Sequence, residues 1–236
     1  ASVMTVLFPK LSGQAARGET GDLRGTVAYG FEFLLALLVP STAALAIYGR
    51  EIIAVAFQRV RFGPADTLFT YPVLVGYAIG LASLSLYQFL QRLYYSLKDY
   101  RTPLASAVLV AVIDIGLSLW LKETRLRVAG LAVANSAAFA AGFVFLAVLA
   151  RRRIGPFGSV RILVGAGKAV AATLPLAGLL AASRTLWPDL WRAGGTLANS
   201  ARIAGILAAA ALATLAMFAI LRMPFVTELL RSRRKP

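Results

Sequence analysis

The sequence contains neither cysteine nor histidine. The absence of cysteine excludes disulfides and thiol nucleophiles, and the absence of histidine removes the commonest general base and a usual zinc ligand. Acidic residues are also scarce, with ten of them against 25 lysines and arginines. The chain has no glycine-rich P-loop and no Gly-x-Ser-x-Gly nucleophile motif. We therefore do not expect this protein to be an enzyme.

Apolar residues dominate the chain, at 59% of the sequence with a mean hydropathy of +0.74. Uncharged stretches of about 18 residues or more are typical of transmembrane helices. The composition predicts an all-α fold, a polytopic membrane helix bundle with six full transmembrane helices. We expect these spans at residues 31–48 (extending outward to 57), 68–90, 104–121, 128–150, 162–183 and 198–221, preceded by the tail of another helix at residues 1–8.

Two features inside these spans predict local geometry. Pro40 lies within the first span and should kink it, because proline removes a helical hydrogen bond. Gly76 and Gly80 form a Gly-x-x-x-Gly pair in the second span. Such pairs allow two helix backbones to approach closely, so we expect a tight helix contact there.

The Arg151–Arg153 triplet and a glycine- and proline-rich link at residues 154–160 mark a boundary. We predict three parts: the end of a truncated helix at 1–8, a four-helix part of a transporter lobe at 9–150, and two additional helices with a basic tail at 151–236. The first residue is not methionine. We therefore expect the chain to be the C-terminal portion of a longer protein.

The formal net charge of +15 is distributed among the connections between apolar stretches. This pattern favours membrane topology and anionic membrane lipids as partners, and it argues against nucleic acid. With a cytoplasmic C-terminus, the positive-inside rule is satisfied, because the inner segments carry 16 lysines and arginines and the outer segments nine. The inner segments are 9–30, 91–103, 151–168 and 222–236; the outer ones are 49–67, 121–127 and 184–202.

The polar run Arg92–Pro103 lies between the second and third spans and is predicted to be a loop. Tyr94 and Tyr95 suit the lipid headgroup layer, where an amphipathic ring has one wet and one apolar end. Pro103 fits the first turn of the next helix, where a missing N–H costs nothing. The charged side chains of the run belong in water or among phosphates: Lys98, Asp99 and Arg101.

Asp114 lies near the middle of the third span. A charged aspartate at that depth costs roughly 2.5–3.5 kcal/mol, so we expect it to face the bundle interior and to have a partner. Ser118 is one turn further along the same helix face.

Four stretches, in order along the chain, resemble the MurJ/MviN family of lipid II flippases. They are the Pro9–Ser12 helix end, the Phe57–Thr67 loop with Phe57, Phe62, Asp66 and Thr67, the Arg92–Pro103 run, and Gly130–Ser136. Val60 stands where that family usually has glycine, which leaves the turn geometry of its loop open.

The resemblance implies the second half of a fourteen-helix flippase of the MOP exporter superfamily. Such a protein moves lipid II, a polyprenyl-pyrophosphate-linked peptidoglycan precursor, from the inner to the outer face of the bacterial cytoplasmic membrane by alternating access. The implied partners are lipid II and the missing N-terminal helices. The last two helices of such a protein border a groove along which the polyprenyl tail stays in lipid. The substrate or gate candidates in this chain are Arg92, Lys98, Asp99 and Arg101.

Some members of that family hold a sodium ion, which would be the only cofactor expected here. By resemblance, its ligands would be Asp114, Ser118 and Asn135, all oxygen donors as a hard cation prefers. A buried hydrogen bond between Asp114 and Asn135, or a protonated Asp114, are alternatives. Two other functions also stay open: a flippase for another polyprenyl-linked oligosaccharide, and a non-transporting scaffold or half-transporter.

Overall fold

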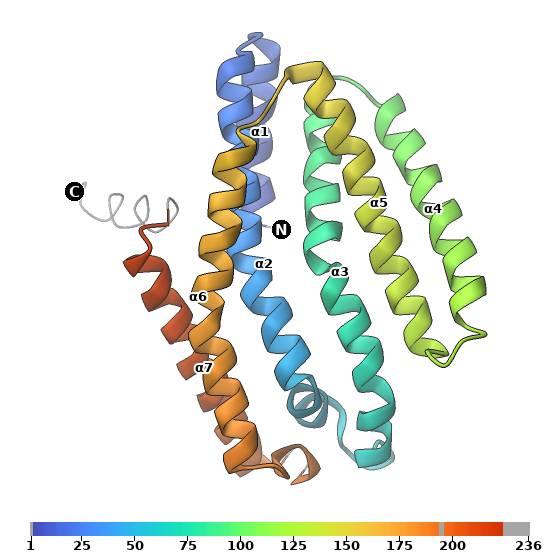
Figure 1. Cartoon of the computed structure of the whole chain (residues 1–236), viewed down its shortest axis with the longest axis vertical. Helices are drawn as coiled ribbons and strands as arrows, with labels where there is room; N and C mark the ends of the chain where they lie inside the picture. Colours follow the sequence, from blue (N-terminus) through green and yellow to red (C-terminus); the bar gives the residue numbers. More distant parts are fainter. Residues whose placement is uncertain (1, 194–195, 224–236) are drawn as a thin grey trace. The chain divides into compact units, whose positions relative to one another are not determined.

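The computed structural model describes residues 2–193 and 196–223, and every regular element in these ranges is a helix (Figure 1). The order is α1 (Ser2–Ala16), α2 (Thr20–Phe57), α3 (Pro64–Ser96), α4 (Arg101–Leu121), α5 (Val128–Ile154), α6 (Ser159–Leu186), the 3₁₀ turn η1 (Leu190–Ala193) and α7 (Leu197–Ile220).

The helices α2 to α7 are each long and apolar enough to cross a membrane. This confirms the predicted all-helical bundle with six spans. The α2 and α3 helices, at 38 and 33 residues, exceed the roughly 20 residues that a bilayer requires. The predicted spans therefore fall inside helices that continue further at their ends.

We predicted that the first helix ends near Pro9, but in the structure it continues through this proline to Ala16. Tertiary contacts explain the continuation. Leu11 is 1% exposed, and the buried Gln14 accepts a hydrogen bond of 2.9 Å from the Thr26 hydroxyl of α2. The polar segment before the first span is thus mostly helical, and only residues 17–19 connect α1 to α2.

The α2 helix departs from helical dihedral angles at Tyr48 (φ −111°, ψ 15°), eight residues after the predicted kink at Pro40. Neighbouring side chains take carbonyls of the turn before the break. The Tyr71 hydroxyl donates to the Ala46 carbonyl at 2.5 Å, and Arg184 Nη1 donates to the Ile47 carbonyl at 2.9 Å. The position of the break is set by these contacts with α3 and α6. A prediction based on proline positions alone does not include them.

Both predicted loops are shorter in the structure because helix ends take part of their length. The Arg92–Pro103 run is helical up to Ser96 and again from Arg101, so the connection is residues 97–100. Tyr94 is 1% exposed and does not lie at a headgroup surface. The Phe57–Thr67 loop ends where α3 begins at Pro64, and Val60 within it has a positive φ of 46°.

Contacts group the chain into two compact units, each containing parts of α2, α3 and α6. The first unit comprises residues 1–35 and 79–166 and includes the α4–α5 hairpin (Figure 1). This grouping does not follow the predicted boundary at residue 151, which stays a prediction about functional lobes.

The core of the first unit is built around Phe31 of α2. Its ring meets three others edge-on, with centroids 5.7 to 6.2 Å away: those of Phe89, Phe143 and Phe157. Small residues let the helices approach closely. A Cβ placed on Gly80 would lie 2.2 Å from the Ser136 hydroxyl, so α3 and α5 touch there. The predicted close helix contact is confirmed at Gly80.

The second unit comprises residues 36–78 and 167–236, and within it the structure describes residues 36–78, 167–193 and 196–223. Its helices bury two apolar clusters. One cluster contains Tyr48, Leu176, Leu180, Leu190, Ile203 and Ala210, and the other contains Ala36, Ala169, Ala172, Phe218 and Met223. Among the contacts at the end of α7, Lys168 Nζ donates to the Leu221 carbonyl at 3.1 Å, a favourable position for a cation.

Candidate functional site

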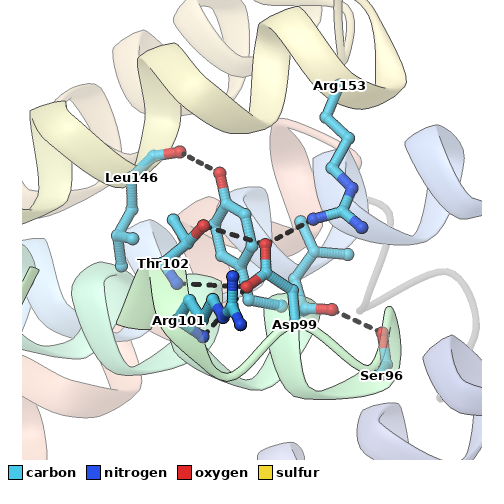
Figure 2. Close-up of polar contacts among 8 residues, drawn as sticks. Ser96, Asp99, Arg101, Thr102, Leu146 and Arg153 are labelled. Atoms are coloured by element: carbon cyan, nitrogen blue, oxygen red, sulfur yellow. Dashed lines mark hydrogen bonds and ion pairs between the residues drawn. The ribbon is translucent and has the colours of Figure 1, made fainter. Parts of the chain in front are cut away.

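The short connection between α3 and α4 is organised by Asp99 (Figure 2). One carboxylate oxygen accepts the backbone N–H groups of Arg101 and Thr102, both at 3.1 Å, and the other accepts the Thr102 hydroxyl at 2.8 Å. Asp99 thus caps the first turn of α4, whose N–H groups have no helical partners. Arg153 Nη1 of α5 also binds this carboxylate.

These contacts favour the charged form of Asp99. Hydrogen bonding from Thr102 and the nearby Arg153 guanidinium hold the pKa of the Asp99 carboxyl below its ordinary value. A second contact fixes the same corner, because the Tyr94 hydroxyl donates to the Leu146 carbonyl of α5 at 3.0 Å. Asp99 therefore attaches the α3–α4 connection to α5, and its carboxylate oxygens are engaged within the protein.

The other three candidates for substrate contact lie in different surroundings. Arg92 is half-buried on α3 and lines a cavity of about 480 Å³. Lys98 is exposed in the connection, and Arg101 is exposed at the first residue of α4. The remaining cavity residues are Phe8, Gln88, Gln91 and Tyr95, so Arg92 is its cationic member among polar and aromatic side chains.

The three candidate cation ligands come together between α4 and α5. Asp114 Oδ2 accepts a hydrogen bond of 3.2 Å from Asn135 Nδ2, and Asp114 Oδ1 accepts one of 3.4 Å from the Ser118 hydroxyl. All three side chains are half-buried. The arrangement contains the aspartate–asparagine hydrogen bond that the sequence left as an alternative. A rotation of the Asn135 amide would present its oxygen on the same side instead.

An apolar groove of about 330 Å³ runs between α2, α6 and α7 in the second unit. Pro40 and Ala44 line it from α2, and Leu176 from α6. The α7 side is formed by Leu207, Ala210, Ala211, Thr214, Leu215 and Phe218. No charged side chain of the described residues lines this groove, so it suits a hydrocarbon chain.

Sequence reasoning missed several partners in these sites. Arg153 was assigned only to the basic triplet that marks a boundary, and its partner Asp99 lies 54 positions away in the sequence. Glu32 and Glu51 received no role, although both are nearly fully buried on α2. Their presence in an apolar stretch of a chain with ten acidic residues is the signal that could have identified them.

The fold and these sites define an all-helical polytopic membrane protein with polar groups between its helices. The family model described as "Lipid II flippase MurJ" matches residues 1–202. The chain therefore belongs to this family.

Relatives and a solved structure agree with this assignment. A probable lipid II flippase MurJ of Thermotoga maritima is 36% identical over 112 residues, which is 48% of this chain and 24% of that protein. One from Rhizobium tropici is 24% identical over 220 residues, covering 93% of this chain and 41% of that protein. A structure described as lipid II flippase MurJ in an inward closed conformation has the same fold, with a TM-score of 0.73 at 21% identity over 96% of this chain and 44% of that one. The chain thus spans less than half the length of these proteins.

Proposed function

We propose that this chain is the C-terminal part of a lipid II flippase, which moves the precursor from the inner to the outer face of the bacterial cytoplasmic membrane by alternating access. The observation that carries the proposal is the family match across residues 1–202. The full transport unit requires further helices, supplied by the same chain or a partner, because this chain covers 24% and 41% of the two relatives described above.

The cationic cavity beside Arg92 is the proposed contact for the substrate's head group. A pyrophosphate that leaves water needs charged donors, and a guanidinium can bind two phosphate oxygens at once. Arg92 offers this group from a half-buried position. Lys98 in the neighbouring connection and Arg101 at the start of α4 are exposed, where they suit a first encounter with phosphates or with anionic membrane lipids.

The apolar groove of α2, α6 and α7 is the proposed path of the polyprenyl tail. Its lining is aliphatic or aromatic apart from Ser41 and Thr214. The Thr214 hydroxyl donates to the Ala210 carbonyl and the Ser41 hydroxyl donates to the Leu37 carbonyl, so both are satisfied within their own helices. An isoprenoid chain could lie there without leaving a polar group unpaired.

The Asp114 cluster is the proposed site of a coupling cation, with sodium as the ion. A carboxylate, a hydroxyl and an amide oxygen match the preference of a hard cation. The ion would offset the cost of a charged aspartate within the membrane.

The proposed orientation places the C-terminus in the cytoplasm. The Arg151–Arg153 triplet ends α5 and lies on the same side as the α3–α4 connection, to which Arg153 binds. Both segments are rich in basic residues, as expected of cytoplasmic connections. The tail at residues 224–236, whose basic residues also support this orientation, lies outside the described residues.

The decisive experiment measures lipid II at the outer face of cells depleted of their own flippase and supplied with the longest form of this protein that its genome encodes. We expect lipid II to reappear outside. If the protein reaches the membrane and lipid II stays inside, the substrate is another polyprenyl-linked oligosaccharide or the protein is a non-transporting scaffold. Export of such oligosaccharides in the same cells separates these two outcomes.

The role of Arg92 is tested by Arg92→Ala in that assay. We expect transport to fall at least about tenfold, the effect of losing about 1.4 kcal/mol of head-group binding, with membrane levels unchanged. Arg125→Ala is the matched control, because Arg125 is exposed in the α4–α5 connection and lines none of the sites described. Equal transport by the two variants would remove Arg92 from the substrate path.

A further inference from the structure

The second unit contains a buried carboxyl group with an incomplete set of partners. Glu51 lies on α2, three residues after the break at Tyr48, and is 1% exposed. Its Oε1 atom is 3.5 Å from Arg184 Nε of α6. Its Oε2 atom is also buried, and no donor in the described part of the chain forms a hydrogen bond with it. A charged carboxylate in this position would keep one oxygen desolvated and unpaired, which is costly.

Glu32, on the same helix but in the first unit, shows what a fully paired buried glutamate looks like. It is 5% exposed, and Arg161 of α6 binds both of its oxygens, at 2.7 and 3.2 Å. A two-point contact of this kind satisfies the charged form. Glu32 and Glu51 thus share burial and differ in pairing.

Two arginines near Glu51 also have other partners. Arg184 divides its donors between Glu51 and the Ile47 carbonyl at the helix break. Arg50 places its guanidinium carbon 5.0 Å from the ring centroid of Tyr71 on α3 and 6.0 Å from that of Trp191 on η1. Its Nε atom is buried and has no hydrogen-bond partner among the described residues. Tyr48 is another ionisable neighbour of Glu51, and its hydroxyl accepts a hydrogen bond from Ser183.

These surroundings act on Glu51 in opposite directions. Burial favours the neutral acid, whereas the charges of Arg50 and Arg184 favour the carboxylate. When such effects oppose one another, a buried carboxyl can exchange a proton without a large change in free energy. At Glu32, by contrast, the two-point contact with Arg161 leaves neither carboxylate oxygen without a partner.

We propose that Glu51 is a proton-binding site that controls how α6 is attached to the broken turn of α2. In the ionised state, Arg184 is held by both Glu51 and the Ile47 carbonyl. Uptake of a proton by Glu51 removes the ionic contact and leaves Arg184 with the carbonyl alone, which loosens α6 at the break. Carboxyl groups within membrane spans serve as proton sites in many transporters, and irregular helix turns accompany ion sites. The proposal does not depend on the substrate that the protein carries.

The proton on Glu51 is tested with a hydrophobic carbodiimide on the purified full-length protein in lipid vesicles. The reagent takes its proton from a carboxylic acid as the acid oxygen adds to it, and the acyl group then shifts to nitrogen, giving a stable adduct that peptide mass spectrometry locates. We expect the Glu51 adduct to form at about pH 6 and to fall at least about fivefold at about pH 9, because the reagent needs the protonated acid. Glu32 is the internal control and should remain unmodified at both values.

A second measurement decides the case in which the reagent does not reach the site. Infrared spectra of the wild type and of Glu51→Gln are recorded across a pH titration and subtracted. The difference should show one carbonyl band of a protonated carboxyl, which disappears as the pH rises. The proposal would be overturned if neither the adduct nor this band were observed at any pH. So would equal modification of Glu32, because the reagent would then report accessibility. Glu51→Gln should fold normally, since its amide resembles the neutral acid in shape.

Discussion

At the scale of single residues, Val60 is held in a conformation that its side chain disfavours. Its φ of 46° lies in the left-handed region, which costs a residue with a Cβ roughly 1–2 kcal/mol and is unusual for a β-branched one. The side chain is fully exposed and packs against nothing that offsets this cost. The sequence resemblance expected glycine at this position, and the backbone agrees with that expectation.

We therefore predict that Val60→Gly stabilises the protein. The gain should be about 1 kcal/mol after the larger entropy of glycine in the unfolded chain is subtracted, and the thermal unfolding midpoint of the purified protein would rise accordingly. Val108→Gly is the matched control: Val108 is exposed on α4, and glycine there should lower stability by about 0.5 kcal/mol. A lower midpoint for Val60→Gly would contradict the prediction.

Asp99 provides a second prediction at this scale. Asp99→Ala removes the cap of α4 and the partner of Arg153, and we expect a loss of about 1–2 kcal/mol in unfolding free energy. Asp22→Asn, at an exposed site on α2, should change stability by less than about 0.5 kcal/mol. Denaturation of the two variants in the same detergent gives the comparison, and equal stabilities would show that the cap contributes nothing.

The effect of Asp99 should also depend on pH. Because its pKa is lowered on folding, the carboxyl stabilises the protein above the ordinary value of about 4, and this contribution is lost as the pH falls through the lowered folded-state pKa. The stability difference between wild type and Asp99→Asn should therefore be full at about pH 7 and shrink below about pH 4. A difference that stays constant to the lowest pH would assign the effect to shape alone.

At the scale of the elements, glycine positions distinguish helix contacts from exposed helix surfaces. A Cβ on Gly80 would meet the Ser136 backbone at 2.7 Å as well as its side chain, whereas one on Gly116 of α4 would meet no atom within 4 Å. Gly80→Ala should destabilise the α3–α5 contact by about 1–3 kcal/mol, and Gly116→Ala should be neutral or stabilising by up to about 1 kcal/mol. Thermal unfolding of both variants tests this; equal midpoints would mean that α3 and α5 separate without cost.

The sequence predicts these elements well where hydrophobicity alone decides and less well at their ends. Each of the six spans contains an apolar stretch long enough for a bilayer, and each is a helix in the structure. The ends depend on tertiary contacts. Leu11 and Gln14 extend α1 beyond Pro9 by packing on other helices, and Tyr71 and Arg184 bind the carbonyls at the break of α2. Neither set of contacts is visible in the local pattern.

The same division applies to the candidate sites. The Asp114, Ser118 and Asn135 group could be predicted because an aspartate in an apolar span requires a partner, and family motifs supplied Asn135. The Asp99–Arg153 and Glu51–Arg184 pairs join residues 54 and 133 positions apart. One sequence does not indicate which of its 25 basic residues meets a given carboxylate, since that choice is made by the packing of whole helices.

At the scale of the whole molecule, the proposed transport elements are distributed over both units. The Arg92 cavity and the Asp114 cluster belong to the first unit, and the apolar groove and Glu51 belong to the second. The helices α2, α3 and α6 contribute to both units, so a change in one unit has a covalent route to the other. Break points such as Tyr48 are where such helices can bend without losing all of their hydrogen bonds.

The proposed cation site leads to a prediction for the full-length protein. If sodium binds the folded state at Asp114, its addition must raise stability by mass action, by about 2.7 kcal/mol at a concentration 100 times the dissociation constant. The thermal unfolding midpoint in sodium chloride should then exceed that in choline chloride at equal ionic strength. Asp114→Asn should remove the difference, because it replaces the anionic ligand with a neutral amide, while Asp22→Asn should retain it. If the wild type shows the same midpoint in both salts, Asp114 is held by Asn135 and Ser118 alone, and the coupling ion must be sought elsewhere, with the carboxyl of Glu51 as the next candidate.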